Sequence, residues 1–600
     1  MHVDQINRME TTLGRATDEG FHENLSEAKT DKDDPLAAAT TFEDLMRVAS
    51  PRGRWALRVV VLCALGNLPG PSSSMTYQLV GATPDHWCRV APLLRANWTD
   101  QQIITFAIPT RNDSEHLEGC VMRDYRYEAA ATLGYEATLA NASLLLASND
   151  TLACPTRSFN HSQHQHTFVT EWDLVCGRRY LYSSSQAAVY LGSLFGSLLA
   201  SLVLNITGRR PAVIVSCVLN IALSFVLAAA PNITVYIILK GVIETLQCLI
   251  YIATFMIAME VCAPSQRNYV GALFMLPWSV GCMLMPGIAY LVQPWRWLQA
   301  VYTALFLGTL AYIWVLPESP RWLIHSGRHG EALRLLRRAA IADGATLPPD
   351  DRLLAAMATI MRRERPRAAA ACPAEPSRSC LRRAYRYLLA LVLTPGLRPK
   401  AAVVFYLWTV AGTSYYGLSH NAKILSTDVY LHAFLVGLVE VPALLCLWPA
   451  ITYLGRRKTL AFLLTVCGAS VALMTLLMVI RQEVPDAVKL LLSLNSKMTM
   501  TASYHLIWVF TVELFSTTNR VRLLGEASLV TRVTTVTVPY INDLLGDVFP
   551  WAPGALCSLA ALVAAGLVFL LPETTNRKIT QQDDSRLDAL EETSQRFIDA

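Results

Sequence analysis

The sequence contains few charged residues for its length. Only 16% of the 600 residues are Asp, Glu, Lys or Arg, whereas 53% are hydrophobic, and the mean hydropathy is positive. A soluble protein of this size needs more charge to cover its surface, so the composition argues against a soluble enzyme or binding protein. The first 50 residues also lack the apolar segment of a signal peptide. They are polar and acidic, and we expect them to form a disordered cytoplasmic tail.

The chain also lacks the motifs of several catalytic classes. It contains no G-x-x-x-x-G-K-[ST] stretch, which argues against ATP hydrolysis, and no G-x-S-x-G nucleophile motif. The apolar runs show no metal-ligand spacing, and the three histidines of NHSQHQH (160–166) are better explained as an exposed loop than as a metal site. We therefore expect no enzymatic activity, no cofactor, no bound metal and no nucleic-acid partner.

The hydrophobic residues are concentrated in runs of about twenty, the length of a helix that spans a bilayer core. Only a helix satisfies its own backbone hydrogen bonds in lipid over such a run. We therefore predict an all-α integral membrane protein with twelve transmembrane helices. The first run is interrupted by GNLPGPSSS. The predicted spans are 57–79, 180–203, 211–230, 233–256, 269–292, 296–316, 401–420, 431–453, 459–480, 489–512, 523–545 and 552–571.

Residues 81–178 form a long polar insert between the first two spans. Its cysteines suggest two disulfides in an oxidising compartment, and three connectivities are open. They are Cys88, Cys120, Cys154 and Cys176. The insert also carries five N-x-[ST] sequons, which we expect to be glycosylated. They are Asn97, Asn112, Asn141, Asn149 and Asn160. Both features predict that the insert is extracellular.

Positive charge marks the opposite side of the membrane. Residues 321–400 contain sixteen Arg and Lys against six Asp and Glu, and two Gly-Arg-Arg turns, at 208–210 and 455–457, add further basic charge. The positive-inside rule places these segments in the cytoplasm. Because the number of spans is even, both termini are then cytoplasmic, and the sequon at Asn205 stays unmodified. We expect a multi-pass protein of the plasma membrane that functions as a monomer.

This topology divides the chain into five parts. An N-terminal tail (1–54) precedes a first six-helix bundle (55–317), which includes the insert. A basic cytoplasmic linker (318–400) contains two segments with apolar residues at helical spacing, GEALRLLRRAAIA and DRLLAAMATIMRRER. A second six-helix bundle (401–573) and a cytoplasmic tail (574–600) follow.

Three charged motifs occur twice, about 250 residues apart. Glu260-x6-Arg267 returns as Glu513-x6-Arg520, the first Gly-Arg-Arg turn returns as the second, and Leu-Pro-Glu at 316–318 returns at 571–573. Each copy follows an equivalent span. The motifs therefore indicate two parallel six-helix repeats, the architecture of secondary transporters whose halves move about a site near the bilayer midplane.

Several longer motifs accompany the two Gly-Arg-Arg turns. They are TPDHWCRV (83–90), VTEWDLVC (169–176), WRWLQA (295–300), LPESPRWLI (316–324), YYGLS (415–419), GLVEVPAL (437–444) and LPET (571–574). Together they resemble the major facilitator superfamily and, within it, the organic cation, carnitine and organic anion transporters of solute carrier family 22. The resemblance implies secondary-active transport by alternating access.

The resemblance also implies a cytoplasmic latch that gates the two halves. Its residues in the first repeat are Arg209, Arg210, Glu260 and Arg267, and those in the second are Arg456, Arg457, Glu513 and Arg520. Two positions depart from the family pattern. Asn205 stands where the family usually has an aspartate, and Ser516 stands where it has a proline, so we expect a weakened latch.

Charged residues inside the predicted spans are candidates for substrate binding, because a charge at mid-bilayer is costly unless it is paired or hydrated. Lys240 and Glu244 lie four residues apart on one helix, and either neutralise each other or leave Glu244 to meet a substrate cation. Glu440 precedes Pro442 and has either a structural or a binding role. Lys497 lies in the outer half of the tenth span.

Arg532, near the middle of the eleventh span, has no obvious acidic partner on its own helix. A guanidinium at this depth would bind a carboxylate in a bidentate manner. The matching position in the family resembles the arginine of anion and carnitine-type members, whereas cation-selective members carry an acid there. The rings of Tyr415 and Tyr416 are candidates for holding an ammonium group.

We therefore expect a secondary-active transporter of small organic ions, with a carnitine-like zwitterion or an organic anion favoured over an organic cation. The alternatives are an organic cation transporter of the same family, a sugar porter of the same superfamily, and a receptor or sensor that keeps the fold without transport. Coupling to Na⁺ or H⁺ is left open by the sequence.

Overall fold

The computed structural model describes residues 42–109, 118–160, 166–262, 270–271, 274–369, 398–419, 428–480, 485–515 and 517–574. The chain divides into two compact units. One comprises Met1–Leu57 and Pro320–Pro373, and the other comprises Arg58–Ser319 and Ala374–Ala600.

The described residues in the first half of the larger unit form six helical segments that match the predicted spans. The first segment is broken into short helices, as GNLPGPSSS predicts: α3 (Arg54–Leu65), α4 (Pro71–Ser74) and α5 (Tyr77–Val80). Four long helices follow: α12 (Arg179–Thr207), α13 (Arg209–Ala228), α14 (Ile233–Val261) and α16 (Leu276–Leu291). The sixth segment consists of α17 (Trp295–Phe306), the 3₁₀ turn η2 (Leu307–Ala311) and α18 (Tyr312–Val315).

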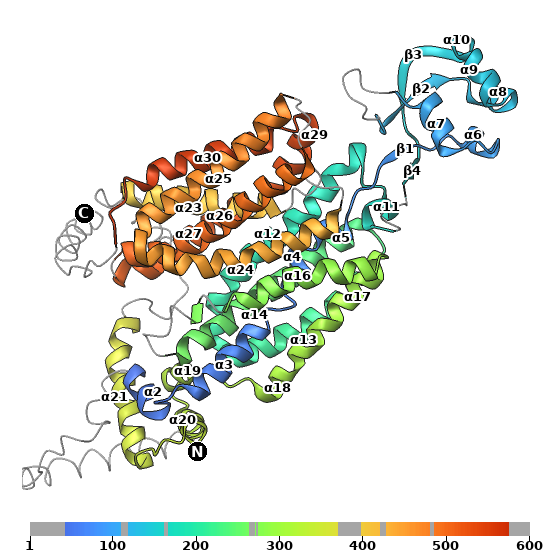
Figure 1. The fold of residues 1–600 in the computed structure, drawn as a ribbon. Coiled ribbons are helices and arrows are strands. Elements are labelled where there is room, and N and C mark those ends of the chain that lie inside the picture. The colour runs from blue at the N-terminus through green and yellow to red at the C-terminus, as the bar shows by residue number, and fades with distance from the viewer. Residues whose placement is uncertain are drawn as a thin grey trace, which may run out of the picture. The chain divides into compact units, whose positions relative to one another are not determined.

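In the described residues of the second half of the larger unit there are also six helical segments. They gather into a bundle of their own (Figure 1). Five are single helices: α23 (Arg398–Ser419), α24 (Val429–Leu454), α25 (Arg456–Val479), α26 (Asp486–Leu514) and α30 (Ala552–Val568). The eleventh segment is composite. It consists of α27 (Thr517–Thr535), α28 (Val538–Tyr540), the π-helical turn η4 (Ile541–Leu545) and α29 (Gly546–Val548).

Helices thus lie in all twelve predicted runs. Six helical stretches of the described chain are long and apolar enough to cross a membrane by length and composition: Cys176–Thr207, Arg209–Ala228, Ile233–Val261, Trp295–Val315, Val429–Leu454 and Arg456–Val479. Two shorter apolar helices are Leu276–Leu291 and Ala552–Val568. Helix α26 carries the buried Lys497 and α27 carries the half-buried Arg532, and both charges are needed for the contacts described below.

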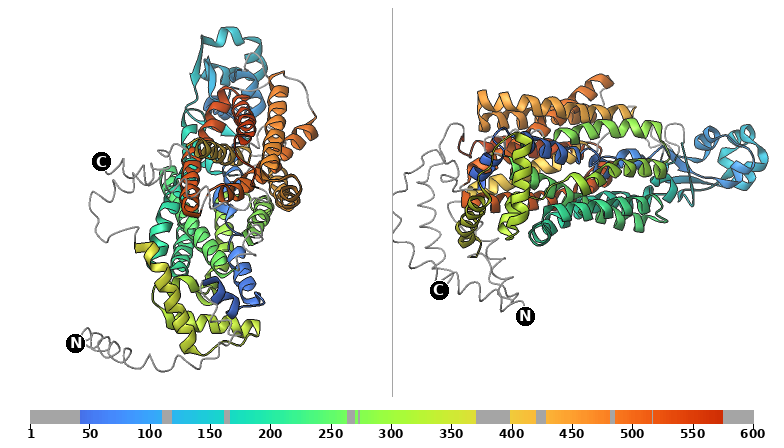
Figure 2. Two further views of the ribbon diagram at one scale, coloured as in Figure 1. Left: turned by 90° about the vertical axis from the view of Figure 1, so that its left-hand side faces the viewer. Right: turned by 90° about the horizontal axis from the view of Figure 1, so that it is seen from below.

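The polar insert forms a small separate domain at one end of the bundles (Figures 1 and 2). Strand β1 (His86–Cys88) pairs with β4 (Arg157–Phe159), and β2 (Val121–Tyr125) pairs with β3 (Leu146–Ala153), both antiparallel. Its helices are α6 (Ala91–Arg95), α7 (Asp100–Ala107), α8 (Tyr127–Leu133), α9 (Tyr135–Ala140), α10 (Ala142–Leu145) and α11 (Phe168–Trp172), and the turn η1 is Cys176–Arg178. Two disulfides, Cys88–Cys154 and Cys120–Cys176, join its segments. The structure therefore selects one of the three open connectivities.

The smaller unit is built from α2 (Phe42–Ala49), α19 (Pro320–His325), α20 (His329–Asp343) and α21 (Asp350–Ala369). The two helices predicted in the linker are thus present. Helix α2 differs from the expected disordered tail, because Phe42, Leu45 and Ala49 fall on one face and are buried against residues of α20 and α21. The general polarity of residues 1–50 concealed this short apolar stripe.

Candidate functional site

The Gly-Arg-Arg turns begin helices α13 and α25. Gly208 has φ +88° and Gly455 has φ +82°, a backbone conformation that glycine adopts without strain. In the first turn the backbone N–H groups of Arg209 and Arg210 donate to the carboxylate of Glu318, at 3.0 and 3.2 Å. A carboxylate at a helix N-terminus satisfies free N–H groups and interacts favourably with the helix dipole. The Leu-Pro-Glu motif therefore supplies the N-terminal cap of α13.

The second repeat has the same construction. The N–H groups of Arg456 and Arg457 donate to Glu573, at 3.0 and 3.2 Å. The paired motifs that the sequence showed as separate repeats thus meet at equivalent points of the two bundles. Their contact is the reason that Leu-Pro-Glu and Gly-Arg-Arg occur together in each half.

The predicted latch residues also meet at these turns. Arg209 forms an ion pair with Glu260 at 3.1 Å, and Arg456 forms one with Glu513 at 3.1 Å. The side chain of Arg210 instead donates to the carbonyl of Ile313 at 2.8 Å. Thr574 donates to the other oxygen of Glu513 at 2.7 Å. The structure therefore joins the glutamate of each Glu-x6-Arg motif to the arginine of the neighbouring turn.

The contacts of the two arginines in the Glu-x6-Arg motifs are not described by the structure. Arg267 lies outside the described residues, as does Ser516, and Arg520 is described only as part of helix α27. The role of the motifs in gating remains a prediction.

Glu440 and Lys497 form a buried ion pair at 3.1 Å, with side chains only 4% and 1% exposed. Glu440 also accepts hydrogen bonds from Tyr415 Oη at 2.6 Å and from Ser279 Oγ at 3.1 Å. Lys497 donates to Ser419 Oγ at 2.7 Å and lies 3.4 Å from the centre of the Tyr415 ring. These contacts connect α23, α24 and α26 of the second half to α16 of the first. Tyr415, a candidate for ammonium binding, is thus engaged by a cation of the protein itself.

Lys240 and Glu244 are not within ion-pair distance of each other, but each acts on the other electrostatically. Glu244 instead accepts a hydrogen bond from Ser73 Oγ of α4 at 2.7 Å. Lys240 is buried in the same helix, with 5% of its surface exposed. No ion pair joins the two side chains in the described part of α14. The hydrogen bond from Ser73 thus joins α4 to α14 at the position of Glu244.

Arg532 lies where the two halves meet. Its guanidinium donates to Ser193 of α12, to the side-chain oxygen and, at 3.3 Å, to the backbone carbonyl. Glu244, Tyr416, Tyr504 and Cys248 lie in its surroundings. Its buried Nε atom has no hydrogen-bond partner among the described residues. The arginine therefore keeps a buried donor available near an acid and two aromatic rings.

Helix α12 contacts the eleventh segment along the half that is nearer the insert. Arg179 forms an ion pair with Asp547, Ser183 Oγ donates to Asp543 at 3.0 Å, and the hydroxyls of Ser184 and Tyr540 lie 3.0 Å apart. We call these three pairs the α12–η4 seam. Nearby, the rings of Tyr190 and Tyr416 are 5.1 Å apart, in an edge-to-face arrangement.

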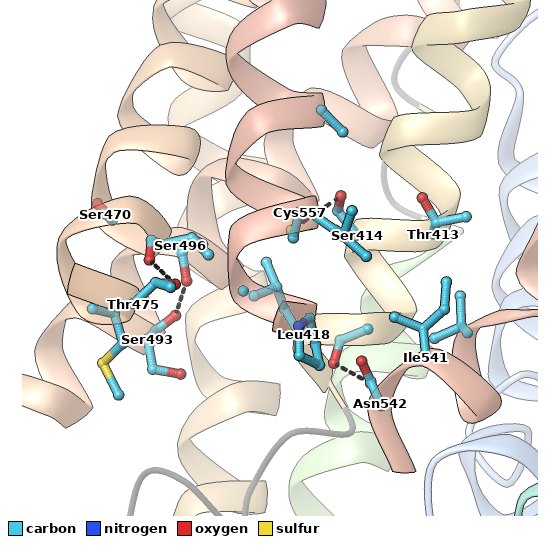
Figure 3. Close-up of a pocket in the computed structure, with 18 of the residues that line it drawn as sticks. Thr413, Ser414, Leu418, Ser470, Thr475, Ser493, Ser496, Ile541, Asn542 and Cys557 are labelled. Carbon is cyan, nitrogen blue, oxygen red and sulfur yellow. Dashed lines mark hydrogen bonds between the residues drawn. The ribbon is translucent and has the colours of Figure 1, made fainter. Parts of the chain in front are cut away.

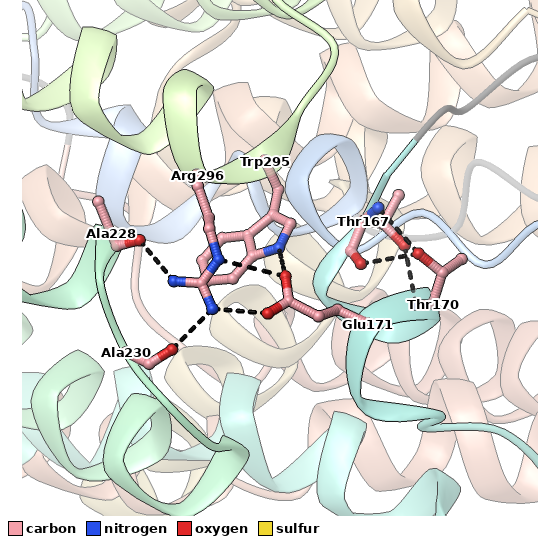
Figure 4. Close-up of polar contacts among 7 residues, drawn as sticks. All are labelled: Thr167, Thr170, Glu171, Ala228, Ala230, Trp295 and Arg296. Carbon is pink, nitrogen blue, oxygen red and sulfur yellow. Dashed lines mark hydrogen bonds and ion pairs between the residues drawn. The ribbon is translucent and has the colours of Figure 1, made fainter.

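The end of the insert is attached to the first bundle by a polar cluster (Figure 4). Glu171 of α11 accepts from Trp295 Nε1 at 2.7 Å and from Arg296 at 2.6 Å. Arg296 also donates to the carbonyls of Ala228 and Ala230 at the end of α13, both at 2.8 Å. Burial opposes ionisation of Glu171, but the hydrogen bonds from Arg296 and Trp295 lower the pKa of its carboxyl below the ordinary value. The VTEW and WRW motifs are thus two sides of one contact.

Several residues in these clusters were not identified from the sequence. Ser73, Ser193, Ser279 and Ser419 each contact one of the candidate charges. A serine in an apolar run carries little signal by itself, because its hydroxyl can bond to a backbone carbonyl of its own helix. The only sequence signal for these serines would have been their position on the same helix faces as charged residues.

Comparisons with known proteins agree with this architecture. The profile of the "Sugar (and other) transporter" family matches residues 131–585. The chain is 32% identical to the "Organic cation transporter protein" of Drosophila melanogaster, over 74% of this chain and 78% of that protein. It is 27% identical to the "Beta-alanine transporter" of Drosophila melanogaster, over 90% of this chain and 88% of that protein. It is 26% identical to the human "Organic cation/carnitine transporter 2", over 91% and 94%.

The fold is also that of a solved transporter. The inward-open structure of the xylose transporter XylE from E. coli superposes with a TM-score of 0.55 at 13% identity, covering 87% of this chain and 98% of that one. The chain is therefore a multi-pass membrane transporter with the major facilitator fold, and not an enzyme. It belongs to the sugar (and other) transporter family and, within it, to the organic cation, carnitine and organic anion transporters of solute carrier family 22.

Proposed function

We propose that this protein carries a small organic ion with a carboxylate group, most simply a carnitine-like zwitterion, across the plasma membrane by alternating access. Arg532 carries the proposal, because its buried Nε has no hydrogen-bond partner among the described residues and a carboxylate would supply one. The other mid-membrane cation that has an identified partner, Lys497, is neutralised by Glu440. Arg532, unlike Lys497, thus keeps a donor that no described residue uses.

The surroundings of Arg532 favour a zwitterion over a simple anion. Glu244 acts electrostatically on the same guanidinium, and the rings of Tyr416 and Tyr504 lie in its surroundings. An ammonium group next to the carboxylate could meet Glu244 or the ring faces. The names of two relatives, one for β-alanine and one for carnitine, fit this chemistry, since both compounds carry an amine or ammonium and a carboxylate.

Alternating access fits the distribution of contacts between the halves. The α12–η4 seam closes the side next to the insert. We propose that the insert is extracellular, that both termini are cytoplasmic, and that Arg209–Glu260 and Arg456–Glu513 support a latch on the cytoplasmic side, in a transporter that acts as a monomer. In this arrangement the seam and the latch would open in alternation.

The test is uptake of three radiolabelled probes into vesicles containing the purified protein: carnitine, a simple carboxylate and tetraethylammonium. We expect carnitine uptake by the wild type and a loss of at least tenfold in Arg532→Asp. Arg532→Lys keeps the charge without the bidentate geometry and should lose less. Lys489→Asp, a charge reversal at the exposed end of α26, serves as the matched control and should transport normally.

A second function, transport of organic cations, is favoured by the name of the Drosophila relative at 32% identity. It predicts strong tetraethylammonium uptake that Arg532→Asp leaves unchanged or increases. That result would refute the carboxylate assignment. Absence of uptake for all three probes, together with retained binding, would instead support a receptor on the same fold.

A further inference from the structure

A cavity of about 330 Å³ lies within the second bundle (Figure 3). Its wall is formed by α23, α25, α26, α30 and the eleventh segment, including the π-helical turn η4. None of the charged residues discussed above lines it. It is therefore separate from the region around Arg532.

The lining of the cavity selects for an uncharged ligand. Most of it is aliphatic, and the described residues that line it include no Asp, Glu, Lys, Arg or His. An ion would lose its hydration there without gaining a counter-charge. The organic ions proposed as transported substrates are thus poor ligands for this cavity.

Three hydroxyl groups in the wall can accept a hydrogen bond from a ligand. Thr413, Thr475 and Ser496 give their hydroxyl hydrogens to carbonyls of their own helices, at 2.7, 2.8 and 2.7 Å. Each hydroxyl oxygen can still accept a hydrogen bond. An alcohol or phenol with an apolar body fits this wall. The volume is near the lower end of the range of small-molecule sites, about 300–1,000 Å³, which favours a ring compound smaller than a sterol.

The cavity shares the turn η4 with the seam between the halves. Ile541 and Asn542 line the cavity, and Asn542 Nδ2 donates to the carbonyl of Gly417 at 3.1 Å. The next residue, Asp543, accepts the hydrogen bond from Ser183 of α12. π-Helical turns are rare and often occur at functional sites. One turn therefore contacts both the cavity and the opposite half of the protein.

We propose that this cavity is a regulatory site for a small uncharged phenol or alcohol, and that its occupation stabilises the arrangement in which the α12–η4 seam is formed. A ligand shifts a conformational equilibrium only by its difference in affinity for the two states. The cavity is bounded by η4 in the seam-closed arrangement, so movement of η4 would change its wall. The consequence for transport rests on the proposed function, but binding and its effect on the seam do not.

Binding is tested by photolabelling the purified full-length protein with an alkylphenol that carries a diazirine. Peptide mapping by mass spectrometry should find labels on cavity residues of α25, α26 and η4, and unlabelled alkylphenol should compete. Ser493→Phe and Met474→Trp both fill the cavity and should each reduce this labelling at least fivefold. Leu491→Phe adds the same ring as Ser493→Phe at a position of α26 that is 67% exposed, and should leave labelling unchanged.

Two results would overturn the binding site. One is labelling that unlabelled alkylphenol does not reduce, and the other is equal labelling of the wild type and both filled variants. The melting temperature of each variant is measured first. If one filled variant does not fold, the other still decides the outcome.

The effect on the seam is tested with Ser183→Cys combined with Asp543→Cys, which places two thiols where a hydrogen bond now spans 3.0 Å. We expect alkylphenol to increase the rate at which an added thiol oxidant converts this pair to a disulfide at least threefold. The increase should disappear when Ser493→Phe is added, and Ser183→Cys alone serves as the control for the native cysteines. An unchanged rate despite competable labelling would refute the coupling. Photolabelling and disulfide formation do not depend on transport. They can therefore support the regulatory cavity even if the uptake experiment refutes the proposed substrate, and the two proposals are tested independently.

Discussion

The buried pair of Lys497 and Glu440 allows a prediction with a matched control on the same helix. Lys497→Met removes the cation but keeps an unbranched apolar side chain of similar length. It leaves Glu440, whose side chain is only 4% exposed, without its counter-charge. Removing one partner of a buried ion pair costs about 3–5 kcal/mol, because the remaining charge stays desolvated. Tyr415 and Ser279 still donate to Glu440, so we expect the lower end of this range.

The control is Lys489→Met. Lys489 pairs with Asp486 at the same distance, 3.1 Å, but their side chains are 34% and 70% exposed. Exposed pairs contribute about 0–1 kcal/mol. The two substitutions are chemically identical, lie in one helix and remove ion pairs of equal length. Any difference between them therefore reports the effect of burial.

The assay is unfolding of the purified protein in detergent, followed by heating and by titration with SDS. Lys497→Met should unfold well before Lys489→Met, and Lys497→Met combined with Glu440→Leu should recover much of the loss, since no charge is then left buried. The reasoning is refuted if Lys497→Met is no less stable than Lys489→Met. It is also refuted if the double variant is as unstable as the sum of its single substitutions.

Three further predictions concern topology, the latch and pH. Glycosidase should shift the electrophoretic mobility of the wild type but not that of a variant lacking Asn97, Asn112, Asn141, Asn149 and Asn160. If the variant still shifts, and the shift disappears only when Asn205 is also replaced, the predicted orientation in the membrane is refuted. A further sequon, Asn232-Ile-Thr, should stay unmodified because Asn232 caps α14 by accepting from Val235 N–H at 2.9 Å. Arg267→Ala or Arg520→Ala should lower the maximal rate at least severalfold with little change in substrate affinity, and loss of affinity at an unchanged rate would contradict the latch. Because the folded-state pKa of Glu171 is lowered, its stabilising effect is full above the ordinary carboxyl pKa and is lost as the pH falls through the folded value. The melting-temperature difference between wild type and Glu171→Gln should accordingly be constant from about pH 8 to 5 and shrink below that, whereas a difference that grows on acidification would show the opposite sign.

The sequence determined the parts of this protein that depend on local chemistry. Apolar runs of bilayer length located all twelve helical segments, because backbone hydrogen bonding in lipid is satisfied within each helix. The repeated motifs revealed the two halves, since equivalent turns need the same glycine and capping glutamate. The helical spacing of apolar residues in the linker was enough to predict α20 and α21.

Only the tertiary structure decided which side chains meet, because partners on different helices are unrelated in sequence spacing. Glu244 contacts Ser73 rather than Lys240, four residues away. Glu440 pairs with Lys497, which the sequence placed in a different span with no indication of contact. The cysteine pairing was likewise undetermined until the strands of the insert were placed. Hydrophobicity determines which segments enter the membrane. A buried charge is costly unless it is paired, and the packing of the helices determines which partner lies close enough to pair with it.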